Sequence, residues 1–133
     1  MINQKNLIKT LMGLTFLVMS FHLFILFKII PFNIVWGGQF KSEQEMYVFE
    51  SISIILNSLL LWVLSLKNQN VKHKFIDITL WFFFIIFFLN TIGNLFAQTN
   101  FEKFFSIFTL LFALFLFKIL WKKKGKPTKQ EKT

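Results

Sequence analysis

The sequence predicts an all-α integral membrane protein, folded as one antiparallel bundle of four transmembrane helices. Two observations predict this class. Hydrophobic residues make up 55% of the 133 residues, with 21 phenylalanines among them. These residues gather in four apolar runs, each reaching the roughly 20 residues that a helix needs to cross the hydrocarbon core of a bilayer. Because short polar segments separate the runs, neighbouring helices must be antiparallel.

The first predicted helix covers residues 7–30. It is largely apolar, and Pro31 ends it because proline cannot continue a helix. Trp36 suits the headgroup region of a bilayer, and Gly37 and Gly38 favour a sharp turn. The chain therefore reverses here, and these last three residues are loop candidates for a functional site.

The second predicted helix covers residues 43–66. Ser42 and Glu45 have the spacing of a capping box, in which each side chain satisfies a backbone amide of the first turn. Polar residues then recur every seven positions along the helix, at Glu43, Gln44, Glu50, Ser51, Asn57, Ser58 and Ser65. A seven-residue repeat keeps one stripe against a partner helix, so we expect this stripe to face inward.

The third predicted helix, residues 75–97, has an apolar first half and a polar end. Asn90 and Asn94 are four residues apart and therefore share a helix face. Gly93 lies between them, and a glycine permits close approach of a second helix. We expect contact between helices at this end.

The fourth predicted helix covers residues 100–121 and opens with a second capping box, formed by Thr99 and Glu102. Residues 122–133 are highly charged and low in hydrophobicity, which predicts a basic, disordered cytoplasmic tail. Lysines near a membrane surface attract anionic lipid headgroups. The tail residues expected to do so are Lys122, Lys123 and Lys124.

The lysines also predict the orientation. Cytoplasmic segments beside membrane spans retain lysine and arginine during insertion. With both termini in the cytoplasm, twelve of the fifteen lysines lie inside, and only Lys28, Lys41 and Lys103 lie outside. We therefore expect cytoplasmic N- and C-termini and an outward Gly37-Gly38 turn.

Several polar side chains fall within the outer half of the predicted spans. Intramembrane ionisable groups are costly and usually face a bundle interior or a hydrated cavity, which makes them candidates for a functional site. Asparagines in the same position equally serve as hydrogen-bonding links between helices. The predicted ligand-binding residues are His22, Glu50, Asn57, Asn90 and Asn94.

Other classes of site find little support in the sequence. The chain has no cysteine, and its two histidines, His22 and His73, fall at opposite membrane faces, so we predict no metal or haem site. We identify no catalytic residues, cofactor motif or phosphate-binding loop, and an enzyme is unsupported. The net charge of +9 comes from lysines outside the apolar runs, which argues against nucleic acid as a partner.

Three stretches, IVWGGQF at 34–40, YVFE at 47–50 and NTIGNLFAQTNFEK at 90–103, resemble those of a family of small, functionally uncharacterised bacterial four-span membrane proteins. The resemblance covers most of the chain and implies a multi-pass protein of the bacterial inner membrane. A weaker likeness, in topology, His22 and Glu50, is to the EXPERA group of sterol isomerases and ligand-binding proteins. Small multidrug transporters are similar in size but carry their acidic residue in the first helix.

Two functions remain open from the sequence. In the first, the outward polar site binds or moves a small or lipidic ligand. In the second, the chain is an accessory subunit that packs against a larger membrane complex, and its polar residues link helices. A cavity lined by Glu50 and the asparagines favours binding, whereas a closed polar core beside an exposed apolar flank favours the subunit.

Overall fold

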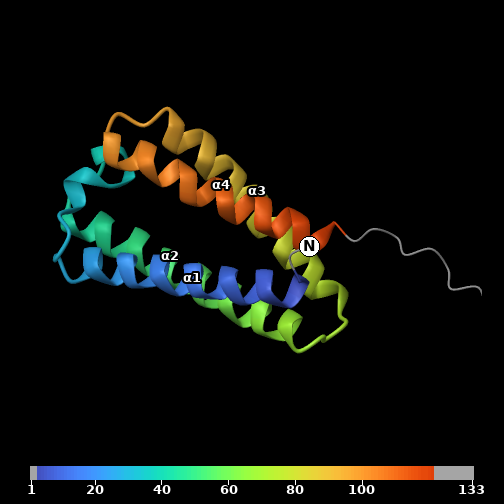
Figure 1. Cartoon of the computed structure of the whole chain (residues 1–133). Helices are drawn as coiled ribbons and strands as arrows, with labels where there is room; N and C mark the ends of the chain where they lie inside the picture. The colour runs from blue at the N-terminus through green and yellow to red at the C-terminus, as the bar shows by residue number, and fades with distance from the viewer. Residues whose placement is uncertain (1–2, 122–133) are drawn as a thin grey trace, which may run out of the picture.

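The computed structural model describes residues 3–121, and they form four long helices (Figure 1). Each is long and apolar enough to cross a membrane, which confirms the all-α bundle and is compatible with a polytopic membrane protein. The predicted tail, with Lys122, Lys123 and Lys124, lies outside the described residues. The helices are α1 (Gln4–Leu26), α2 (Glu43–Asn68), α3 (Lys74–Leu95) and α4 (Asn100–Leu120).

The helix starts follow their caps, and the bounds of α1 depart most from the prediction, whereas the other helices differ from it by one or two residues. Asn3 accepts a hydrogen bond from the Lys5 amide, so α1 begins three residues before the predicted start at residue 7. It ends at Leu26 rather than at residue 30, because Lys28 adopts a left-handed conformation (φ 60°). The residues that follow are still apolar, so composition alone did not reveal this end.

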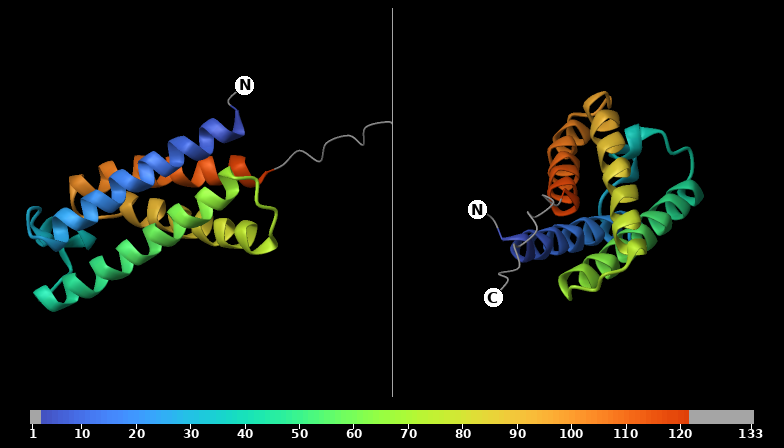
Figure 2. Two further views of the ribbon diagram at one scale, coloured as in Figure 1. Left: turned by 90° about the horizontal axis from the view of Figure 1, so that it is seen from below. Right: turned by 90° about the vertical axis from the view of Figure 1, so that its right-hand side faces the viewer.

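The four helices form two pairs. α1 packs along α2, and α3 packs along α4, with much less contact between the pairs. Figure 1 shows the pairs close together at the end that holds the N-terminus and the 69–73 turn, which we call the terminal end. They diverge at the loop end, which holds the connecting segment (residues 27–42) and the turn at residues 96–99. Figure 2 shows the two pairs as layers that cross at an angle.

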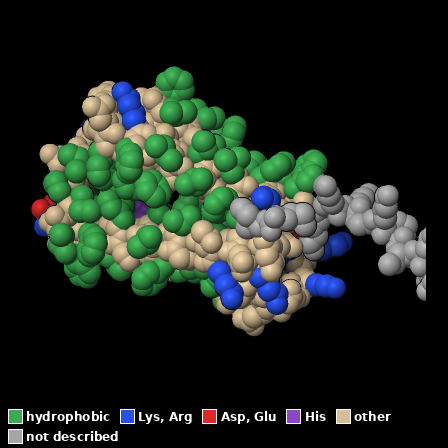
Figure 3. Space-filling model, viewed as in Figure 1, with side chains coloured by type: hydrophobic (Ala, Val, Ile, Leu, Met, Phe, Trp, Pro, Cys, Tyr) green, Lys and Arg blue, Asp and Glu red, His purple; other side chains and the backbone are tan. Residues whose placement is uncertain are grey.

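Apolar side chains close the bundle toward the terminal end. Five leucines contributed by all four helices have no exposed surface: Leu11, Leu60, Leu64, Leu80 and Leu116. A smaller cluster of Ile25, Val35 and Met46 holds the connecting segment against α1 and α2 at the loop end. Many other large apolar side chains are exposed, as Figure 3 shows, and this suits helices surrounded by lipid.

The polar stripe of α2 faces inward only in part. Glu50 and Asn57 are buried, as predicted, whereas Ser51 and Ser58 are exposed. The Ser58 hydroxyl donates to the Ile54 carbonyl, which satisfies it within its own helix. The seven-residue repeat therefore locates the buried face of α2 to within one residue.

Candidate ligand-binding cavity

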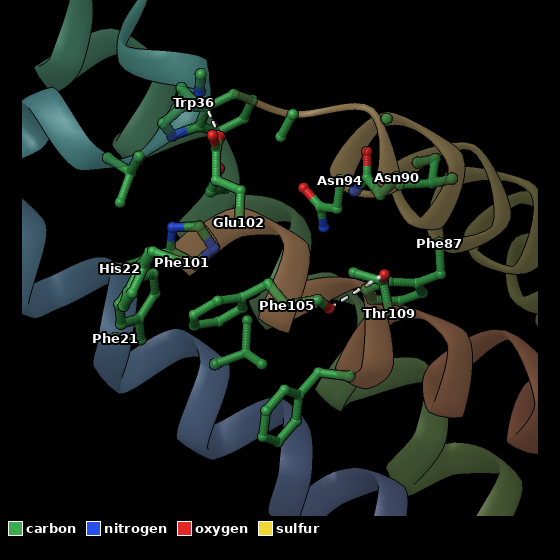
Figure 4. A pocket seen from close by; sticks show the side chains of 18 of the residues that line it. Phe21, His22, Trp36, Phe87, Asn90, Asn94, Phe101, Glu102, Phe105 and Thr109 are labelled. Carbon is green, nitrogen blue, oxygen red and sulfur yellow. Dashed lines mark hydrogen bonds between the residues drawn. The ribbon is translucent and has the colours of Figure 1, made fainter. Parts of the chain in front are cut away.

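A cavity of about 600 Å³ lies between the two helix pairs near the loop end (Figure 4). All four helices and the connecting segment contribute to its wall, and its volume is typical of pockets for small molecules. Aromatic rings supply much of the wall: Phe21, Trp36, Phe83, Phe87, Phe96, Phe101, Phe105, Phe108 and Phe112. The polar lining residues are His22, Gln39, Ser53, Asn57, Asn90, Asn94, Gln98, Glu102 and Thr109.

Glu50 lies behind this wall rather than in it. Its side chain is fully buried, and its two oxygens have separate partners in the protein. His22 Nδ1 lies 2.7 Å from Oε2, and the Trp36 indole N–H donates to Oε1 at 2.8 Å. Since His22 and Trp36 both line the cavity, Glu50 supports two wall residues without lining the cavity itself.

The contact with Glu50 affects which ring nitrogen of His22 carries a proton. When the Glu50 carboxylate is ionised it only accepts hydrogen bonds, and the His22 nitrogen that faces it, Nδ1, then carries a proton. In a neutral imidazole the second nitrogen, Nε2, is then an acceptor. Nε2 of this ring, which forms part of the cavity wall, therefore accepts a hydrogen bond when the imidazole is neutral and donates one when it is protonated.

Asn57 supplies a second acceptor. Its amide nitrogen donates to the Ser53 carbonyl at 2.8 Å, which fixes the orientation of the amide group. The side-chain oxygen, Oδ1, is buried and has no partner among the described residues. Leaving a buried acceptor unpaired costs about 1–3 kcal/mol. Since Asn57 is only 9% exposed and lines the cavity, a molecule in the cavity can satisfy this oxygen.

Asn90 and Asn94 line the cavity from α3, and this agrees with their shared helix face. Figure 4 shows both on the side of α3 that faces His22 and Phe105. Asn90 is exposed and Asn94 half-buried. The expectation that Gly93 brings another helix close is wrong, because a Cβ atom built at Gly93 meets no heavy atom within 4 Å. Gly93 borders open space instead.

Glu102 belongs to the site, although sequence reasoning placed it only in a capping box. Thr99 does cap α4, but the Glu102 carboxylate does not reach back to the Thr99 amide. It accepts hydrogen bonds from the Gly37 amide and from the Thr99 hydroxyl. Only 8% of Glu102 is exposed. The sequence held one indication of this contact, because Glu102 and the Gly37-Gly38 turn were predicted at the same membrane face.

The connecting segment is held by both helix pairs. Trp36 bonds to Glu50 of α2, and Gly37 bonds to Glu102 of α4. Trp36, Gly37 and Gly38 all adopt left-handed conformations, with φ of 54°, 69° and 65°. Of these three loop candidates, Trp36 and Gly37 line the cavity and Gly38 does not. The two carboxylates thus fix a strained turn that joins the pairs where they diverge.

Within residues 3–121, no three histidine or acidic side chains come together as metal ligands. Compared with known proteins, the chain matches no family model, no curated protein and no solved structure.

Proposed function

We propose that this chain is a multi-pass protein of the bacterial inner membrane that binds or moves a small or lipidic ligand in the cavity between its helix pairs. The observation that carries the proposal is the unpaired Asn57 oxygen in the wall of a cavity rich in phenylalanine. Proteins seldom keep such a group without a partner, and an apolar space alone gives it none. A bound molecule supplies both the missing hydrogen bond and the apolar contact.

The wall indicates the chemistry of this ligand. The unpaired acceptor, Asn57 Oδ1, requires a donor such as a hydroxyl or an amine N–H group, and a neutral His22 can accept from the same kind of group through Nε2. The phenylalanines favour an apolar body next to that group. Asn90, Asn94 and Gln98 can donate or accept, and they suit a second polar group. An amphipathic molecule with at least one donor satisfies the whole wall.

The orientation belongs to the same proposal. With both termini in the cytoplasm, as the lysine distribution predicts, the loop end and the cavity lie in the outer half of the membrane. The ligand then comes from the outer leaflet or from the space outside the membrane. The open cavity favours binding, although Asn57, Asn90 and Asn94 line it and Glu50 does not. The accessory-subunit alternative called for a closed polar core beside an exposed apolar flank, and only the exposed flank is present in the part of the chain that the structure describes.

The test compares two asparagines. Asn57 and Asn68 both carry a buried Oδ1 that has no partner within residues 3–121, but only Asn57 lines the cavity. We expect Asn57→Leu to reduce the ligand that copurifies from native membranes at least tenfold, while Asn68→Leu leaves it unchanged. Native mass spectrometry of protein extracted in mild detergent measures the bound mass. No bound mass on the wild-type protein, or equal loss in both variants, would contradict the proposal.

A further inference from the structure

A second cavity, of about 350 Å³, lies at the terminal end and is separate from the first. It is formed by the first turns of α1, the last turn of α2, the 69–73 turn and the start of α3. Four lysines line it, together with one acidic residue, Asp77. The lysines are Lys5, Lys67, Lys72 and Lys74. Figure 3 shows lysine side chains gathered at this end of the molecule.

One of these charges is neutralised within the protein. Lys67 forms an ion pair with Asp77, and its side chain is only 11% exposed. Among the described residues, Lys5, Lys72 and Lys74 have no carboxylate partner. Three positively charged side chains that line one small cavity repel one another, and an anion bound there reduces this repulsion.

Other residues that line the cavity indicate which kind of anion it suits. Asn70 adds a side-chain amide that can donate to an oxygen atom. Ile8 and Val71 add apolar surface beside the lysines, and Val71 is 42% exposed. Because helix ends of transmembrane spans lie near the headgroups, this mixture of ammonium and apolar groups matches the junction of a phosphate headgroup with its glycerol and acyl chains.

We propose that this terminal cavity binds a phosphate group, and that the group belongs to an anionic phospholipid of the leaflet that borders the terminal end. Free phosphate offers the same charge and the same oxygen acceptors, so the experiment must separate the two sources. Lysines that only fix topology act through the summed surface charge, whereas a binding site depends on which lysines line the cavity.

The chain provides a matched comparison. Lys9 and Lys118 are exposed at the same end of the bundle but do not line the cavity. The cavity variant is Lys72→Gln with Lys74→Gln, and the control is Lys9→Gln with Lys118→Gln. Each removes two charges. Purified full-length proteins are titrated with phosphatidylglycerol and, separately, with phosphatidylcholine, and bound lipid is counted by native mass spectrometry.

We expect the wild-type protein and the control to bind phosphatidylglycerol in preference to phosphatidylcholine, and the cavity variant to bind it about tenfold more weakly. Circular dichroism verifies that each variant is folded, and Lys72→Gln alone replaces the cavity variant if the double substitution unfolds. Thermal stability measured with and without inorganic phosphate distinguishes a phospholipid headgroup from free phosphate as the bound group. Stabilisation by phosphate alone, lost in the cavity variant, assigns the site to a free anion. Equal weakening in cavity and control variants, or no preference for phosphatidylglycerol, overturns the proposal.

Discussion

At the scale of single residues, Glu50 holds two side chains of the cavity wall, His22 and Trp36, although it does not line the cavity itself. It accepts a hydrogen bond from Trp36 and contacts Nδ1 of His22, so an ionised Glu50 beside a neutral imidazole leaves Nε2 as an acceptor. Glutamine can replace both contacts only if its amide N–H group donates to Nδ1, which moves the imidazole proton to Nε2. For a neutral imidazole, the side chain at position 50 therefore determines which ring nitrogen of His22 carries the proton.

We expect Glu50→Gln to keep the thermal stability of the purified protein close to that of the wild type, while less ligand is retained. Glu50→Leu leaves the Trp36 N–H group and His22 without their partner and should lower the free energy of unfolding by about 1–3 kcal/mol. Thermal denaturation in detergent and native mass spectrometry measure the two effects. A Gln variant with full stability and full ligand occupancy would show that the proton position on His22 is unimportant.

At the scale of elements, the connecting segment joins the two helix pairs at the end where they diverge. Its turn depends on glycine at Gly38, which has a φ of 65°, and a Cβ atom there would lie 3.0 Å from the Asn33 carbonyl oxygen. Gly93, in contrast, is helical and borders open space. Backbone conformation therefore requires glycine at position 38 but not at position 93.

We expect Gly38→Ala to destabilise the protein by about 1–2 kcal/mol, because a left-handed alanine is strained and its Cβ meets a backbone oxygen. Gly93→Ala should be neutral or stabilise its helix by up to about 1 kcal/mol. Thermal unfolding of both variants in the same detergent compares them. Similar midpoints for the two would argue against a turn that depends on the left-handed conformation of residue 38.

The elements themselves could largely be predicted from the sequence, whereas their arrangement could not. Apolar run length and the caps at Ser42 and Thr99 located the helices to within a few residues. The divergence of the pairs was not predictable, since these helices are apolar on most of their surface and lipid-facing and packed faces have similar composition. The partner of Glu102 was missed for a different reason. A carboxylate that bonds to Gly37, 65 residues away, leaves no local pattern.

At the scale of the whole molecule, the chain is a wedge that is closed by leucines at one end and hollow at the other. If the lysines orient it as predicted, reporter fusions at Lys129 and in the Gly37-Gly38 turn should report opposite compartments. The N-terminus should give the same signal as Lys129. Equal signals from the turn and the C-terminus would contradict the four-span topology.

The central claim is that the cavity holds a specific ligand, and site-specific photo-cross-linking tests it most directly. Phe104 and Phe105 are adjacent on α4, but Phe104 is 57% exposed and does not line the cavity, whereas Phe105 lines it. A photoreactive phenylalanine analogue is placed at each position in turn, and the protein is irradiated in native membranes. Mass spectrometry should find one or a few enriched adducts at residue 105 and the bulk lipid composition at residue 104. Identical adduct profiles at the two positions would contradict a selective cavity.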